Sequence, residues 1–166
     1  MPAHFPVAAI TDEFSPDIET AVRSMAALGM TGAELRMVFG KNIVDLSDAE
    51  LARAIEIVRG AGLAIISIAS PLLKCVLPDS PEVDARFQQD MFAAVHTFAD
   101  QPRLTARALE IADRSGARII RVFSYWRTVD PDACFPRIVE ALRGKQASLA
   151  SWKLCASSRT RPRATI

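Results

Sequence analysis

The chain has 166 residues, half of them apolar, with 20 basic and 19 acidic side chains and three cysteines. This composition excludes a disordered chain, a collagen-like chain and a small disulfide scaffold, and it predicts one core of ordinary size. The charge is divided unevenly, because residues 1–143 have a net charge of −4 while residues 144–166 carry five basic side chains and no acidic one.

The cysteines and the lengths of the apolar runs indicate the cellular compartment of the chain. Cys75, Cys134 and Cys155 form no CxxC or Cys/His cluster, so we expect neither a zinc site nor a disulfide framework. The odd number of cysteines and the absence of a leader pattern indicate reduced thiols in the cytoplasm. The longest apolar run, near residues 63–69, is too short to span a bilayer. The acidic balance of residues 1–143 argues against a nucleic-acid partner.

Strand and helix signals alternate from the start of the chain. Residues 7–11 predict a short strand, and Ser15 is the expected N-cap of a helix that Gly29 ends. Residues 32–38 predict a second strand. The capping box at residues 47–50 then opens a second helix, which ends at Gly60 or Gly62.

The alternation continues to about residue 142. Residues 63–69 predict a buried strand that is rich in isoleucine. A helix is expected from Ser80 on, with a helix-packing stripe that consists of Val83, Phe87, Met91 and Val95. A second helix is expected after Asp100-Gln101-Pro102 and ends at Gly116. Residues 118–123 predict a fourth strand, and residues 130–142 predict a last helix.

This pattern is four βα units with an extra helix after the third strand, which indicates an α/β fold with helices outside a parallel sheet. Open doubly wound sheets and closed (βα)8 TIM barrels share it. The turn after the first strand, residues 11–16, has no GxGxxG and no phosphate-loop lysine, which disfavours a dinucleotide or ATP site. A complete barrel takes about 250 residues. We therefore expect the N-terminal half of a TIM barrel.

Ligands bind at the carboxyl ends of the strands in parallel βα architectures. The polar residues that follow the predicted strands are Asp12, Glu13, Glu34, Arg36, Lys41, Asn42, Ser70, Lys74, Arg121, Ser124 and Tyr125. From these we expect substrate contacts by Glu34, Arg36, Ser70, Lys74 and Arg121. Carboxylates, cations and hydroxyls together suit a polyhydroxylated or anionic small molecule.

Structural interpretations of the same residues stay open. Glu34 and Arg36 share one face of their strand and also fit an ion pair, and Lys74 also fits a solvated loop charge. Arg121 lies inside an apolar strand, where a charge needs a partner or a ligand, and this favours a site. His96 lies on a predicted helix away from the strand ends, so we expect it to be structural.

Several segments resemble the xylose-isomerase-like TIM-barrel superfamily, and within it the bacterial sugar phosphate isomerase/epimerase group. The first segments are Gly32-Ala33-Glu34-Leu35-Arg36, Gly40-Lys41-Asn42 and Ile68-Ala69-Ser70-Pro71-Leu72-Leu73-Lys74-Cys75. Residues 108–112 and 116–124 are similar to that group's third helix and fourth strand. The resemblance covers about residues 5–143.

The resemblance implies an enzyme that uses a divalent metal, Mn, Mg, Co or Zn, and acts on a sugar or polyol. A carboxylate base moves a proton between carbons that flank a carbonyl, and the metal stabilises the enediolate. The family's metal ligands lie on strands five to eight and have no counterpart here, so we expect this chain alone to hold no metal. The endonuclease-IV-like DNA repair branch has histidines where this chain has Ser70 and Ser124, which disfavours that alternative.

The last part of the chain differs from the rest. Residues 1–143 are the expected partial barrel, and residues 144–166 are a basic, aperiodic tail that we expect to be disordered or to follow a change of reading frame near residues 143–147. A truncated isomerase would be inactive alone, and the gene's nucleotide sequence tests this expectation. Two other functions stay open: a non-catalytic half-barrel that self-associates through exposed strand edges, and a nucleic-acid arm formed by the tail.

Overall fold

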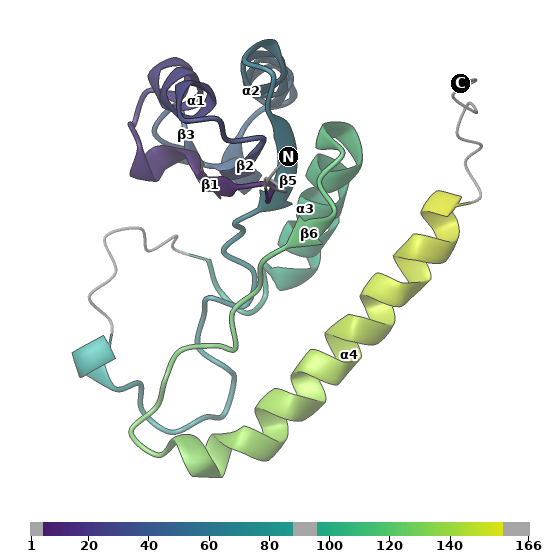
Figure 1. Cartoon of the computed structure of the whole chain (residues 1–166). Helices are drawn as coiled ribbons and strands as arrows, with labels where there is room; N and C mark the ends of the chain where they lie inside the picture. The colour runs from purple at the N-terminus through teal and green to yellow at the C-terminus, as the bar shows by residue number, and fades with distance from the viewer. Residues whose placement is uncertain (1–4, 88–95, 158–166) are drawn as a thin grey trace. The chain divides into compact units, whose positions relative to one another are not determined.

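The computed structural model describes residues 5–87 and 96–157, with side chains described for 5–86 and 96–144. The chain divides into two compact units (Figure 1). The first unit consists of Met1–Cys75 and Met91–Phe123, and the second consists of Val76–Asp90 and Ser124–Ile166. The division expected at residue 143 stays a prediction.

The first unit contains a four-stranded parallel sheet. Its strands are β1 (Ala8–Ile10), β2 (Gly32–Leu35), β5 (Ala64–Ile68) and β6 (Ile119–Ile120), and they lie in the order β1-β2-β5-β6. All neighbouring strands are parallel. Each crossover therefore moves one strand further in the same direction. The alternation of strand and helix signals thus predicted the α/β class and the parallel sheet.

Three helices accompany this sheet: α1 (Ile18–Ala27), α2 (Asp48–Gly60) and α3 (Gln101–Ser115). Helices α1 and α2 lie side by side, and both α2 and α3 contact β5 (Figure 1). Right-handed crossovers in one direction place all connecting helices on one face of a sheet. The largest fully buried side chains of the core are Met25, Leu35, Ile43, Leu51, Ile68, Leu104 and Ile111.

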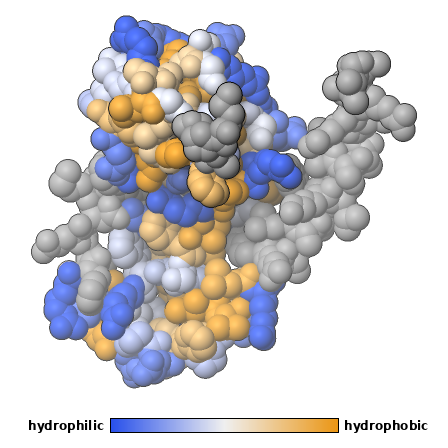
Figure 2. All heavy atoms as spheres, in the orientation of Figure 1, coloured by the Kyte–Doolittle hydropathy of each residue, from blue (hydrophilic) through white to orange (hydrophobic). Residues whose placement is uncertain are grey.

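The other face of the sheet carries apolar side chains that reach the surface. Ala33 and Leu35 belong to the core, so alternation along β2 places Gly32 on the opposite face. A Cβ on Gly32 would lie 3.0 Å from the side chains of Ala8 and Ile66. Ala8 and Ile66 are therefore on the same face of the sheet as Gly32. Ile66 is 37% exposed, and Figure 2 shows apolar residues at the surface of this unit.

The second predicted strand, residues 32–38, is in fact two strands. Strand β2 ends at Leu35, and β3 (Met37–Val38) pairs antiparallel with β4 (Lys41–Asn42) in a separate hairpin. The turn between β3 and β4 has positive φ at Phe39 (53°) and Gly40 (74°), as tight two-residue hairpin turns require. The break after Leu35 places Arg36 in the bend.

The helix starts agree with the prediction in part. Ser47 and Glu50 form the predicted capping box of α2, with Ser47 N donating to Glu50 Oε2 at 2.8 Å. Ser15 is not the N-cap of α1, and that prediction is wrong. Asp17 caps this helix, because its carboxylate accepts from Thr20 N at 2.9 Å while Ser15 Oγ accepts from Asp17 N.

Helix α3 and strand β5 match their predicted positions closely, whereas β6 is shorter than residues 118–123. Gly116 ends α3 in the left-handed conformation, with φ of 79°. Beyond β6 the chain still contacts the segment after β5, because Arg121 N donates to Ile68 O and Phe123 N donates to Leu72 O.

The helix predicted from Ser80 is absent over the described part of its range, up to residue 87. Val83 instead forms an isolated bridge with Thr128, and the 3-10 turn η3 spans Ala85–Phe87. Asp84 N donates to Arg127 O, and Val129 N donates to Glu82 O. These backbone hydrogen bonds take the place of the bonds that a helix would form within the segment. Met91 and Val95, the rest of the expected stripe, lie outside the described residues.

The second unit also contains α4 (Pro131–Ser157), which continues past Leu142, its expected end, and includes Pro136. Residues 158–166 of the tail lie outside the described part. Arg137 donates to the carbonyls of Pro78 and Asp79, which ties α4 to the segment that precedes the bridge. Within 5–87 and 96–157, no helix has the length and apolarity needed to cross a membrane.

We expect the capping box to make stability dependent on pH. Hydrogen bonds from Lys41 and Ser47 lower the pKa of Glu50 from 4.5 to about 2. A lowered pKa stabilises the fold fully above pH 4.5, and this contribution falls as the pH drops toward 2. Glu50→Gln should therefore flatten the pH dependence of urea unfolding over this interval. Glu56→Gln, on the same helix, is the control, and an equal effect of both variants contradicts the prediction.

Candidate functional site

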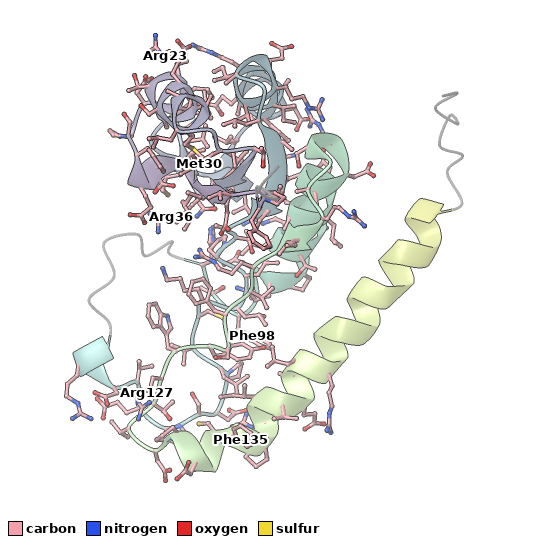
Figure 3. The ribbon with its side chains drawn as sticks, viewed as in Figure 1. Arg23, Met30, Arg36, Phe98, Arg127 and Phe135 are labelled. Carbon is pink, nitrogen blue, oxygen red and sulfur yellow. The ribbon has the colours of Figure 1, made fainter. Side chains whose placement is uncertain are left out.

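An ion-pair cluster joins the end of β2 to the 3-10 helix η1 (Thr11–Glu13). We call this cluster, which consists of Asp12, Glu13 and Arg36, the Arg36 clamp; Figure 3 labels Arg36. Arg36 Nη2 lies 2.7 Å from Asp12 Oδ2 and 2.6 Å from Glu13 Oε1. Asp12 also accepts a hydrogen bond from Met37 N at 3.2 Å. The clamp thus fixes the start of the β3–β4 hairpin.

The clamp is shielded from solvent, since the side chains of Arg36 and Asp12 are 14% and 7% exposed. Burial opposes the charge of Arg36, but hydrogen bonds to Asp12 and Glu13 outweigh it and raise the pKa of this guanidinium. Arg36 therefore pairs with the carboxylates of η1, and the expected alternative of a pair with Glu34 does not occur. A substrate that bound to Arg36, as predicted, would have to compete with the carboxylates of Asp12 and Glu13.

Glu34 differs from the clamp carboxylates. It lies in β2 between Ala33 and Leu35, two core residues, so its side chain is on the face opposite the helices. The residue is half-buried, and within the described part of the chain its carboxylate has neither a hydrogen bond nor an ion pair. The carboxylate of Glu34 is therefore available to accept hydrogen bonds, and its predicted contact with substrate stays a prediction.

Ser70 holds two strand ends together. It is fully buried, and its hydroxyl donates to Arg121 O at 2.6 Å and accepts from Leu72 N at 3.3 Å. These bonds join the loop after β5 to the segment after β6. Ser70 therefore positions the backbone at Arg121, and its predicted contact with substrate stays a prediction.

The loop after β5 is held in an unusual conformation before Lys74. Leu73 has a φ of 62°, and its N–H donates to Gln101 Oε1 at 2.8 Å. Gln101 is 1% exposed and donates from its amide nitrogen to Thr97 O at 3.0 Å. We did not predict a role for Gln101, whose only sequence signal is its place in the first turn of α3.

Lys74 and Arg121 both approach the ring of Phe123, and we call these three residues the cation cluster. Lys74 Nζ lies 5.2 Å and Arg121 Cζ lies 5.0 Å from the ring centroid. Lys74 is 7% exposed, so its interpretation as a solvated loop charge is wrong. Phe123 was not predicted as a site residue, because a phenylalanine in an apolar strand is ordinarily part of a core.

The structure thus brings together Ser70, Lys74 and Arg121, and it places Glu34 across β5 from them. The register places Ile119 level with Glu34, about 10 Å away across two strand spacings, and Arg121 lies two residues further along the chain. Other strand-end candidates serve the fold: Lys41 pairs with Glu50 at 2.7 Å, and Asn42 Oδ1 accepts from Val44 N. Ser124 and Tyr125 belong to the second unit.

The described residues do not fit a metal ion. No group of three His, Cys, Asp or Glu side chains within residues 5–86 and 96–144 could hold one. His96 Nε2 lies 3.6 Å from Asp45 Oδ1, at the end of the 3-10 helix η2 (Ile43–Asp45), and His96 itself lies before α3. One histidine beside one carboxylate is not a metal site.

The second unit has a surface hollow of its own. Tyr125, Trp126, Thr128 and Cys134 are among its lining residues, and Thr128 Oγ1 lies 3.5 Å from Cys134 Sγ. Ser80 Oγ also lines it and is a buried atom without a hydrogen-bond partner. Because the described lining offers no charged pair aimed at a ligand, the strand ends of the first unit are the stronger candidate.

Comparison of the chain with protein-family models, with curated proteins and with solved structures found no match.

We expect Asp12→Asn to lower the free energy of unfolding by about 2 kcal/mol, because it leaves the shielded Arg36 without its buried partner. Glu13→Gln is the matched control. Glu13 is 59% exposed, so we expect a loss of at most about 0.5 kcal/mol. Urea denaturation followed by circular dichroism measures both values. Equal losses in the two variants would show that the clamp does not depend on burial.

Proposed function

We propose that the first unit is the substrate-binding part of a sugar or sugar-phosphate isomerase/epimerase of the xylose-isomerase-like kind. The observation that carries this proposal is the set of charged groups at the carboxyl ends of parallel strands. Glu34 offers a carboxylate without a partner among the described residues, and Lys74 and Arg121 offer two cations. A sugar derivative has hydroxyl groups for the carboxylate and oxygen atoms for the cations.

The strand order supports half of a TIM barrel as the scaffold. A doubly wound sheet reverses its direction at a switch point, whereas the strands of a barrel follow one another in chain order. The order β1-β2-β5-β6 corresponds to the second arrangement. In this proposal, Ile66 and Ile119, which are 37% and 57% exposed, lie on the face that lines the interior of the barrel.

The reaction class rests on the resemblance of residues 32–36 and 68–75 to the isomerase family. That class moves a proton between the carbons beside a carbonyl, with a divalent metal to hold substrate oxygens. The described residues do not fit the metal, so the proposal leaves metal binding and the catalytic base to other residues. Glu34 and the cation cluster bind and orient the substrate.

A binding experiment without added metal tests the proposal. We expect pentoses, hexoses or their phosphates to bind the full chain in saturation-transfer NMR, and Glu34→Gln to weaken that binding about tenfold, the loss of one charge-assisted hydrogen bond. Glu56→Gln, an exposed carboxylate on α2, is the control and should bind as the wild type does. Equal affinity of the wild type and Glu34→Gln would contradict the assignment of Glu34.

The same samples test the absence of a metal group among the described residues. Added Mn²⁺ or Mg²⁺ should produce no isomerisation by this chain alone, because residues 5–86 and 96–144 contain no group of side chains that could hold a metal ion. Turnover that depends on either metal would contradict this part of the proposal.

A second function, a half-barrel that associates with its own copies, is favoured by the exposed face of the sheet. Ile119 is 57% exposed, and β1 and β6 each have one neighbour among the described strands. Uncovered strand edges and apolar faces favour pairing between chains.

If the chain associates through this face, sedimentation velocity should show a discrete dimer for the wild type. Ile119→Lys should then give a monomer, because a charge in the apolar contact is costly to bury. Val129→Lys, at a position 61% exposed in the second unit, is the matched control and should remain dimeric. A monomeric wild type rejects this second function.

A further inference from the structure

We propose that Arg121 and Lys74 form a binding site for an oxyanion, the phosphate or carboxylate group of a small-molecule substrate. As a statement about the substrate class, this proposal rests on the proposed function. The anion site itself depends only on the contacts of the cation cluster.

The first argument is that one buried donor of the Arg121 guanidinium lacks an acceptor. Its Nε is buried and has no hydrogen-bond partner, and its Nη2 donates to Ala69 O at a long 3.3 Å. Within the described part of the chain it has no carboxylate partner. A guanidinium has five N–H donors, and a buried donor left unsatisfied is unfavourable. An oxygen of a ligand would supply the missing acceptor.

Two other arginines that are shielded from solvent, Arg36 and Arg107, both have carboxylate partners. Arg36 is 14% exposed and has two carboxylates within 2.7 Å, and Arg107 is 17% exposed and lies 2.8 Å from both Asp48 and Glu110. Hydrogen bonds to these carboxylates raise the pKa of both guanidinium groups against the effect of burial. Arg121 departs from this pattern, at a strand end where ligands of parallel sheets bind.

The second argument is the nearness of another positive charge. Lys74 is 7% exposed, and its Nζ lies 5.2 Å from the centroid of the same Phe123 ring that Arg121 approaches. The ring attracts both cations through its negative face, so both positive charges are held beside the same side chain. An anion bound beside this ring would be attracted by both charges, whereas a ligand with hydroxyl groups alone would gain much less from them.

The third argument is that the site is preorganised. Leu73, next to Lys74, has a left-handed backbone, which is strained for a leucine and persists only where surrounding contacts hold it. Gln101 supplies such a contact to Leu73 N, and Ser70 fixes the backbone at Arg121. Groups held in place before binding lose less entropy when a ligand arrives.

The chemistry of the two side chains identifies the ligand group. The planar fork of a guanidinium matches two oxygens of a phosphate or carboxylate, and an ammonium acts as a point charge beside it. A sugar phosphate and a sugar acid share this feature, so both sources of the oxyanion are included in the test.

The test is a titration of the full chain with inorganic phosphate and, separately, with acetate, followed by ¹H–¹⁵N NMR at low ionic strength. We expect shifts of the amides of Leu72, Arg121 and Phe123. Arg121→Gln should weaken phosphate binding about tenfold or more. Arg118→Gln removes an exposed arginine at the other end of β6, and it should change the affinity less than twofold. Unchanged binding in Arg121→Gln, or equal losses in both variants, would overturn the proposal.

Two further variants keep the test decisive if Arg121→Gln does not fold. Lys74→Met removes the second charge and should also weaken binding, whereas Arg121→Lys keeps the charge but loses the fork and should bind phosphate more weakly than the wild type. Wild-type affinity in both variants would overturn the proposal. Folding of each variant is checked by circular dichroism.

A comparison of ribose, ribose 5-phosphate and gluconate separates this proposal from the proposed function. Tighter binding of the phosphate ester identifies a phosphate, and tighter binding of gluconate identifies a carboxylate. If ribose binds as well as both, and Arg121→Gln does not affect any of them, the anion site is rejected while the sugar-binding function stands. If phosphate binds at Arg121 but no sugar does, the anion site stands and the proposed function fails.

Discussion

The candidate site depends on the hydrogen bond from Ser70 Oγ to Arg121 O, which is 2.6 Å long. Strand β6 has only two residues in the ladder with β5, so regular pairing alone fixes little of the chain that follows. Ser70 joins the two strand ends just beyond that short ladder. The positions of Arg121 and Phe123 relative to Lys74 follow from this bond and from the contacts of Phe123 N and Arg121 N with the segment after β5.

Local signals in the sequence predicted those parts of the fold whose hydrogen bonds are local. The capping box at Ser47 and the left-handed end of α3 at Gly116 involve residues within a few positions of each other, and both were predicted. The helix expected at Ser80 is absent where it is described, because residues 82–84 form backbone bonds to residues 127–129. A partner more than forty positions away leaves no local signal in the sequence.

In the candidate site, too, the features with a local signal in the sequence were predicted, and those that depend on distant partners were not. The rule that ligands bind at strand ends selected Glu34, Lys74 and Arg121 because it needs only the order of strands and helices. It did not distinguish Arg36, whose two carboxylates make it part of the fold, from Arg121, which has none among the described residues. That distinction depends on which loops meet in space. Gln101 and Phe123 were missed for the same reason, since an amide in a first helical turn and a ring in an apolar strand have common structural roles.

Burial connects the exposed face of the sheet with the strength of the cation cluster. The attraction between a cation and an anion grows as the surrounding dielectric constant falls, so an oxyanion binds more tightly where water is excluded. Ile66 and Ile119 leave the face beside the cluster partly open to water. Any segment or second copy that covers this face removes water from around Arg121 and Lys74. It also raises the energetic cost of leaving the buried Nε of Arg121 without an acceptor. Covering the sheet would therefore favour the proposed binding of the oxyanion, and that binding would favour the covered state to the same extent.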